Sequence, residues 1–71
     1  MSDDEKRAAR LLDLELPFDK EKLNSAYKEK LKYYHPDFWS KNEVLAMVAH
    51  KKTQEIINAN KVLNSYLKKQ N

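Results

Sequence analysis

The segment Tyr33-Tyr34-His35-Pro36-Asp37 lies near the middle of the 71-residue chain and separates two runs of helical periodicity. Pro36 cannot continue a helix, because it lacks an N–H and its ring clashes with the preceding turn. It also pushes His35 towards an extended conformation. We therefore expect residues 35–37 to form a tight, exposed corner between two helices. The Asp37 carboxylate would face the negative end of the helix dipole there, so it would either pair with a cation from elsewhere or only shape the loop, as aspartate often does.

The composition favours a single all-α domain. A chain of 71 residues is near the lower size limit for a hydrophobic core without covalent staples. It contains no cysteine, which excludes disulfides and thiolate metal sites, and no glycine, which disfavours a hairpin-rich β fold. Lysine, glutamate, leucine and alanine, which are strong helix formers, are abundant.

The charge and hydropathy patterns predict a cytoplasmic protein that acts as a monomer. Fourteen basic and eleven acidic residues give a net charge of +3, which fits solvated helix faces better than a nucleic-acid footprint. No stretch is apolar enough to span a membrane, and the N-terminus Met-Ser-Asp-Asp-Glu does not resemble a signal peptide. We expect neither nucleic acid nor membrane as a partner of this segment.

Two capping-box patterns predict the starts of the first and third helices. Ser2-Asp3-Asp4-Glu5 has the Ser-x-x-Glu spacing and predicts a first helix at about residues 3–13. Ser40-Lys41-Asn42-Glu43 repeats the pattern and predicts a third helix at about residues 41–68, with Trp39 as its hydrophobic staple.

The second helix is predicted at about residues 19–34, with Asp19 as its N-cap and the preceding phenylalanine as a staple. One face is apolar and carries Leu23, Ala26, Tyr27, Leu31 and Tyr34. Lys30 falls in the middle of this face, so we expect its stem to pack inward and its ammonium to reach the edge. Lys28 and Lys32 lie on the opposite face.

The third helix carries a packing stripe at alternating spacings of four and three, apolar except for Lys52 and made of Leu45, Ala49, Lys52, Ile56, Ala59, Leu63 and Tyr66. A run of about 28 residues would be ~42 Å long, against ~24 Å for the second helix. It must therefore overhang its partner or break near His50. The short connection predicts an antiparallel hairpin of the two long helices, with the first helix packed across it. The predicted core contains Leu12, Leu23, Ala26, Ile56, Ala59 and Leu63.

Taken together, these patterns resemble the J domain of the DnaJ (heat-shock 40-kDa class) co-chaperones. Both characteristic spacings fit that family: Leu12 to Tyr27 is fifteen residues, and Leu23 to His35 is twelve. The match covers almost the whole chain, and it is most similar to the terminal J domains of membrane-anchored DnaJ-like proteins. Residues that fit the motifs are Ala26, Tyr27, Lys28, His35, Pro36 and Asp37, and then Ile56, Ala59, Val62 and Leu63 in the pattern Ile-x-x-Ala-x-x-Val-Leu.

The resemblance implies a co-chaperone that docks on a DnaK-type 70-kDa heat-shock chaperone and stimulates its ATP hydrolysis. In the family, the exposed side of the second helix docks on the ATPase domain, and the His-Pro-Asp corner reaches an arginine near the interdomain linker. The chemistry belongs to the chaperone, so no catalytic residue, cofactor or metal is expected in this chain. Residues that match family contact positions are Tyr27, Lys28, His35, Pro36 and Asp37; Lys32 is added from its place on the same helix.

The chain also departs from the family pattern, and these departures concern the strength and choice of partner more than the fold. The docking face is less basic than usual, and the short fourth helix of longer J domains is missing. An excised domain is expected, which would be cytosol-facing if the parent protein is membrane-anchored. The departing positions are Asn24, Ser25 and Glu29 for basic residues, Lys30 for a leucine, and Thr53 and Asn60 for Phe and Tyr.

Three alternatives remain open. The first is a divergent J-like module that binds another protein through the aromatic pair Phe38-Trp39. The second is a small helical nucleic-acid binder, for which the chain has lysines but only two arginines and no evident recognition helix. The third is an enzyme that uses His35 and Asp37 as a dyad, but no activated nucleophile is evident and only two histidines could bind a metal.

Overall fold

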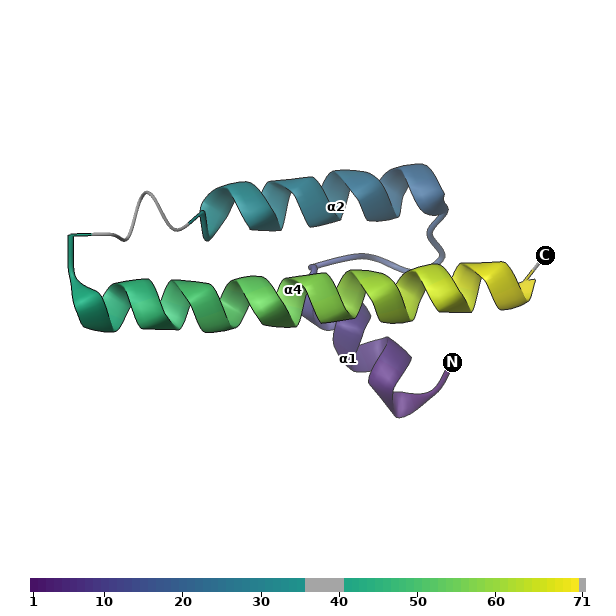
Figure 1. Ribbon diagram of the computed structural model, residues 1–71. Helices are drawn as coiled ribbons and strands as arrows, with labels where there is room; N and C mark the ends of the chain where they lie inside the picture. Colours follow the sequence, from purple (N-terminus) through teal and green to yellow (C-terminus); the bar gives the residue numbers. More distant parts are fainter. Residues whose placement is uncertain (36–40, 71) are drawn as a thin grey trace.

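The computed structural model describes residues 1–35 and 41–70, and within these ranges it contains three α-helices and no strand. The helices are α1 (Asp3–Leu11), α2 (Lys20–Tyr33) and α4 (Glu43–Gln70), as Figure 1 shows. The predicted all-α class is therefore confirmed. His35 is the last described residue of the predicted corner, because Pro36 and Asp37 lie outside the described residues, as do Phe38, Trp39 and Ser40.

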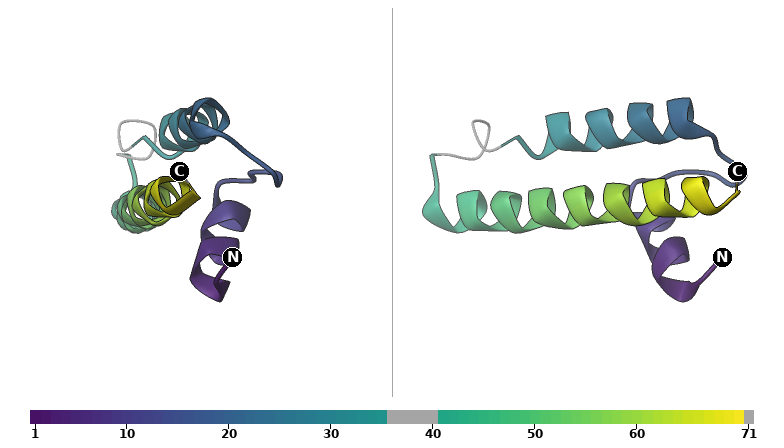
Figure 2. Two further views of the ribbon diagram at one scale, coloured as in Figure 1. Left: turned by 90° about the vertical axis from the view of Figure 1, so that its right-hand side faces the viewer. Right: turned by 45° about the vertical axis from the view of Figure 1, so that its right-hand side comes forward.

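The two longer helices, α2 and α4, lie side by side and run antiparallel, and α1 packs against α4 at an angle (Figures 1 and 2). Viewed along α4 in Figure 2, α1 and α2 occupy different sides of the long helix, so α4 is the element that both partners share. The molecule is elongated, with extents of 44 × 21 × 16 Å, because α4 is much longer than either neighbour.

The hydrophobic core is built where all three helices meet. Five of the six side chains predicted to form the core are buried there. The sixth, Ala26, is only half-buried and packs against the edge of the cluster, so its predicted place in the interior is wrong. The buried residues are Ala8, Ala9, Leu12, Leu23, Ile56, Ala59 and Leu63. Each large aliphatic side chain in this set contributes about 1.5–3 kcal/mol through burial.

The N-terminus of α1 is held by the predicted capping box. The Ser2 backbone N–H donates to Glu5 Oε1 at 2.7 Å, and the Glu5 N–H donates to Ser2 Oγ at 3.2 Å. The two bonds satisfy donors that the first turn of a helix leaves unpaired.

The C-terminus of α1 comes two residues earlier than predicted, at Leu11. The N–H of Leu14 donates to the Ala9 carbonyl at 2.8 Å, and the N–H of Asp13 donates to the Arg10 carbonyl at 3.0 Å. This pair of bonds is a Schellman motif, and Asp13 adopts the left-handed conformation with φ of 52°. Glycine usually fills that position, but aspartate tolerates it better than most residues.

The α2 helix begins as predicted, because Asp19 accepts a hydrogen bond from the Lys22 N–H at 2.8 Å and acts as its N-cap. Tyr34 is the C-cap, so α2 is one residue shorter at each end than the predicted range of 19–34. Phe18 packs against the core, and its ring lies 5.9 Å from that of Tyr66, centroid to centroid.

The α4 helix begins at Glu43, two residues later than predicted. Its cap is Asn42, whose side-chain oxygen accepts from the N–H groups of Val44 and Leu45 at 2.9 and 3.2 Å. The predicted start at residue 41 is therefore two residues too early, and the predicted cap Ser40 lies outside the described residues. The helix continues unbroken past His50 to Gln70, so the predicted overhang is confirmed and the alternative of a break is not.

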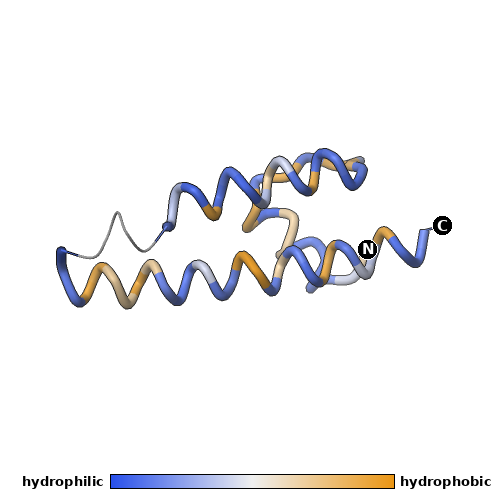
Figure 3. Tube along the Cα trace, turned by 45° about the horizontal axis from the view of Figure 1, so that its top comes forward, coloured by the Kyte–Doolittle hydropathy of each residue, from blue (hydrophilic) through white to orange (hydrophobic). Residues whose placement is uncertain are grey.

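The overhanging first turns of α4 are apolar and exposed. Figure 3 shows hydrophobic residues along this end of the helix, beyond the part that α2 covers. Val44 is 69% exposed, Met47 73% and Val48 50%, and Leu45 is exposed as well. These four residues are called the α4 apolar patch below.

Candidate partner-binding surface

The outer face of α2 presents two lysines to solvent. Lys28 and Lys32 are both exposed and lie four residues apart, which places them one turn apart on the same face. At 100° per residue this face is opposite Leu23, which is fully buried against α4. Neither ammonium is paired with a carboxylate of residues 1–35 and 41–70. Both charges are therefore available to an acidic partner.

Tyr27, the third predicted contact residue on α2, lies at the border between this face and the core. It is half-buried and packs against the core cluster. The structure thus separates the α2 candidates into two lysines that project into solvent and one tyrosine that contributes to packing.

His35 follows α2 directly and is exposed. The predicted partners Pro36 and Asp37 lie outside the described residues, so the geometry of the corner itself stays a prediction. The structure does define the point from which the corner departs, which is the C-cap residue Tyr34.

Tyr34 is anchored to α4 in two ways. Its carbonyl oxygen accepts a hydrogen bond from Thr53 Oγ1 at 3.3 Å, across a sequence separation of 19 residues. Its side chain packs against the core and, together with Leu45, Val48 and Ala49, lines a small apolar cavity of about 30 Å³. On its other side the ring stands edge-on to Tyr33, with 4.8 Å between ring centroids. The end of α2 is therefore fixed on α4 by both backbone and side chain.

The middle of α2 is tied to the end of α1 by an ion pair. Lys30 Nζ donates to Asp13 Oδ2, and this hydrogen bond raises the pKa of Lys30. The lysine side chain is 28% exposed, as expected for a stem that packs inward while its ammonium reaches the edge. The sequence predicted this placement of Lys30 but not the carboxylate that receives it.

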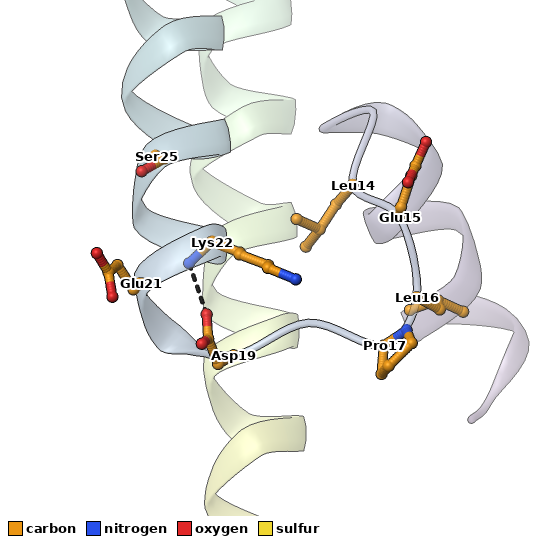
Figure 4. A pocket seen from close by; sticks show the side chains of 8 residues that line it. All are labelled: Leu14, Glu15, Leu16, Pro17, Asp19, Glu21, Lys22 and Ser25. Carbon is orange, nitrogen blue, oxygen red and sulfur yellow. Dashed lines mark hydrogen bonds between the residues drawn. The ribbon is translucent and has the colours of Figure 1, made fainter.

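A cleft of about 710 Å³ lies far from His35, between the α1–α2 connection and the first turns of α2 (Figure 4). Its charged groups do not converge. In Figure 4, Lys22 extends towards Leu14, Glu21 points away from the cleft, and Asp19 is committed to capping α2. The lining residues are Leu14, Glu15, Leu16, Pro17, Asp19, Glu21, Lys22 and Ser25.

Residues 1–35 and 41–70 hold neither a metal-binding cluster nor a membrane-spanning helix. No three or more His, Cys, Asp or Glu side chains gather there in a way that could hold a metal ion. In the same part of the chain, no helix combines the length and the hydropathy that crossing a bilayer requires.

No protein-family model, no curated protein and no solved structure matches the chain. The resemblance to J domains therefore rests on the motifs and spacings in the sequence.

Proposed function

We propose that this chain is a J-like co-chaperone domain that docks on a DnaK-type 70-kDa heat-shock chaperone and promotes its ATP hydrolysis. The observation that carries the proposal is the arrangement of α2. This helix presents Lys28 and Lys32 on the side opposite the core and ends at Tyr33, two residues before His35, where the His-Pro-Asp sequence begins. The cationic face of α2 can contact an acidic region of a partner. The polar corner that follows the helix can contact a neighbouring cationic region.

The two parts of this surface have different roles in the proposed mechanism. Lys28 and Lys32 attract an acidic surface, which sets the orientation and the rate of encounter. The Asp37 carboxylate then pairs with a cation of the chaperone, in a partly desolvated contact where a charge-assisted bond is strong. The domain performs no bond-breaking step. It shifts the chaperone towards the conformation that hydrolyses ATP, by binding that conformation more tightly.

The test is single-turnover ATP hydrolysis by a DnaK-type chaperone with increasing concentrations of the purified chain. We expect the wild type to accelerate hydrolysis and both Asp37→Asn and His35→Gln to abolish the effect. Circular dichroism and melting temperature should stay close to wild type, because within residues 1–35 and 41–70 the core and the α1 cap are formed by other side chains. Variants that melt far below wild type would mean that the corner is structural, and fully active variants would refute the proposed function.

A second candidate function is favoured by the α4 apolar patch. Val44, Met47 and Val48 are exposed on one end of α4, and exposed apolar groups of this kind are typical of protein interfaces. A divergent J-like module could use them to bind a different protein, which is the alternative raised above for Phe38-Trp39. The ATPase assay separates the two functions, because this module would leave the chaperone's hydrolysis rate unchanged.

A further inference from the structure

The end of α2 depends on a hydrogen bond that the sequence does not reveal. The last carbonyls of a helix have no intrahelical donor and must find partners elsewhere. For the Tyr34 carbonyl that partner is the Thr53 hydroxyl, which belongs to the middle of α4. Tyr34 is the residue immediately before His35, so this bond acts at the point where the chain leaves α2.

The geometry of Thr53 shows how the bond is made. Its hydroxyl oxygen lies 2.8 Å from the Ala49 carbonyl, one turn earlier in α4, and 3.3 Å from the Tyr34 carbonyl. A hydroxyl has one proton, so the two carbonyls share a single donor. The bond to Ala49 holds the side chain in the rotamer that points its oxygen towards α2. Thr53 is half-buried, which limits competition from water.

The surroundings make this contact specific. Tyr34 packs on the same stretch of α4, where Ala49 is 1% exposed and allows the aromatic ring to approach the helix closely. The ring therefore sets the distance between the end of α2 and α4. The carbonyl bond sets the orientation of the peptide plane that leads to His35. Removing the Thr53 hydroxyl would leave the packing of the Tyr34 ring in place, but the peptide plane that leads to His35 would no longer be held in one orientation.

We propose that Thr53 is a positioning residue, whose hydroxyl fixes the direction in which the chain leaves α2 and so sets how His35 is presented to the chaperone. This inference rests on the proposed function. It makes the presentation of His35 depend on α4, separately from the docking face at Lys28 and Lys32.

The experiment compares Thr53→Val, which replaces the hydroxyl by a methyl, with Thr53→Ser, which keeps the hydroxyl. Single-turnover ATP hydrolysis by a DnaK-type chaperone is titrated with each variant, giving a maximal stimulation and a half-saturating concentration. For Thr53→Val we expect maximal stimulation to fall about two- to tenfold, the range that one lost hydrogen bond corresponds to. The half-saturating concentration should stay within about twofold, since Lys28 and Lys32 are untouched. Thr53→Ser should recover most of the stimulation.

A measurement on the free domain tests the hydrogen bond itself. The carbonyl-carbon NMR shift of Tyr34 should move upfield in Thr53→Val and stay near the wild-type value in Thr53→Ser. A Thr53→Val variant with wild-type maximal stimulation would overturn the inference and leave the proposed function intact. The inference would also be overturned if Thr53→Val changed only the half-saturating concentration, or if Thr53→Ser were as impaired as Thr53→Val. A wild-type chain that does not stimulate hydrolysis would overturn the proposed function, and this inference with it.

Discussion

The ammonium of Lys30 and the carboxylate of Asp13 form an ion pair that joins the middle of α2 to the turn that ends α1. The two residues are 17 positions apart in the sequence, and their contact is a direct side-chain link between these elements. Asp13 can reach Lys30 because its left-handed conformation turns the chain sharply after α1. The same residue thus ends one helix and binds the next.

This ion pair is expected to stabilise the fold only modestly, because the Asp13 side chain is 74% exposed. We expect Asp13→Asn to lower the free energy of unfolding by less than about 1 kcal/mol at neutral pH. Asparagine also tolerates the left-handed conformation, so the substitution removes the charge without straining the turn. Urea melts measure the change, and Glu15→Gln, which neutralises an exposed carboxylate of the same connection, is the matched control.

The pH dependence of this difference follows from the raised pKa of Lys30. A group whose pKa is higher in the folded state adds stability that is complete below its unfolded pKa, near 10.5 here. That stability is lost as the pH rises through the raised folded value. The difference in the free energy of unfolding between wild type and Asp13→Asn should therefore become smaller above pH 10.5. If this difference in the free energy of unfolding stays constant above pH 10.5, the charge of Lys30 is not its cause.

The features that could be predicted from the sequence are those set by local or periodic patterns. The stripe that contains Ile56, Ala59 and Leu63 follows from helical spacing, and all three residues are buried. The caps at Ser2 and Asp19 follow from short motifs whose bonds stay within one turn. Such contacts need no knowledge of how the helices lie relative to one another.

The features that were missed depend on the register between elements or on unusual residues. The Schellman motif at Asp13 carries no glycine to mark it. The cap of α4 is Asn42, whereas the capping-box spacing pointed to Ser40 and so to a helix start two residues earlier. Thr53 was noted only as a departure from the family pattern, because its bond to Tyr34 requires the alignment of α2 on α4. Helical periodicity gives the facing sides of two helices but not their relative shift.

Asn60 offers a test of the cost of an unsatisfied polar atom. Its Oδ1 is buried and has no hydrogen-bond partner among residues 1–35 and 41–70, whereas its backbone carbonyl accepts from Asn64 Nδ2 at 3.0 Å. An orphaned buried acceptor costs about 1–3 kcal/mol. We therefore expect Asn60→Ala to raise the free energy of unfolding by about 1 kcal/mol more than Asn58→Ala, an exposed site on the same helix that corrects for helix propensity. Equal effects of the two substitutions would show that the oxygen carries no penalty.

The capping box at the start of α1 predicts a pH effect of opposite sign. The hydrogen bond from the Ser2 backbone N–H lowers the pKa of Glu5 below its ordinary value of 4.5. A lowered folded pKa means that the stabilisation is present above pH 4.5 and is lost as the pH falls through the folded value. An NMR titration of the Glu5 side chain should show the lowered pKa in wild type. Ser2→Ala keeps the N–H and should retain most of the shift, whereas Ser2→Pro removes the N–H and should abolish it. Equal pKa values in these two variants would exclude the backbone bond as the main cause.

The last prediction concerns the two exposed lysines of α2. If Lys28 contacts an acidic surface of the chaperone, Lys28→Glu replaces an attraction by a repulsion and should raise the half-saturating concentration in the ATPase assay by about tenfold or more. Lys61→Glu makes the same change of net charge at another exposed site, on α4, and should have little effect. Comparing the two separates a contact at α2 from a general dependence on net charge.

The salt dependence of binding distinguishes a contact through the lysines of α2 from a contact through the α4 apolar patch. Exposed charges are screened over about 10 Å at 0.1 M ionic strength, so binding through Lys28 and Lys32 should weaken steadily as salt increases. Binding through the α4 apolar patch would respond weakly to salt, because burial of apolar surface does not depend on charge. A steep salt dependence in wild type that becomes shallower in Lys28→Glu, and not in Lys61→Glu, would place the docking face on α2. A flat dependence in all three proteins would instead move the contact to Val44, Met47 and Val48, and the substitution to make next would be Met47→Glu.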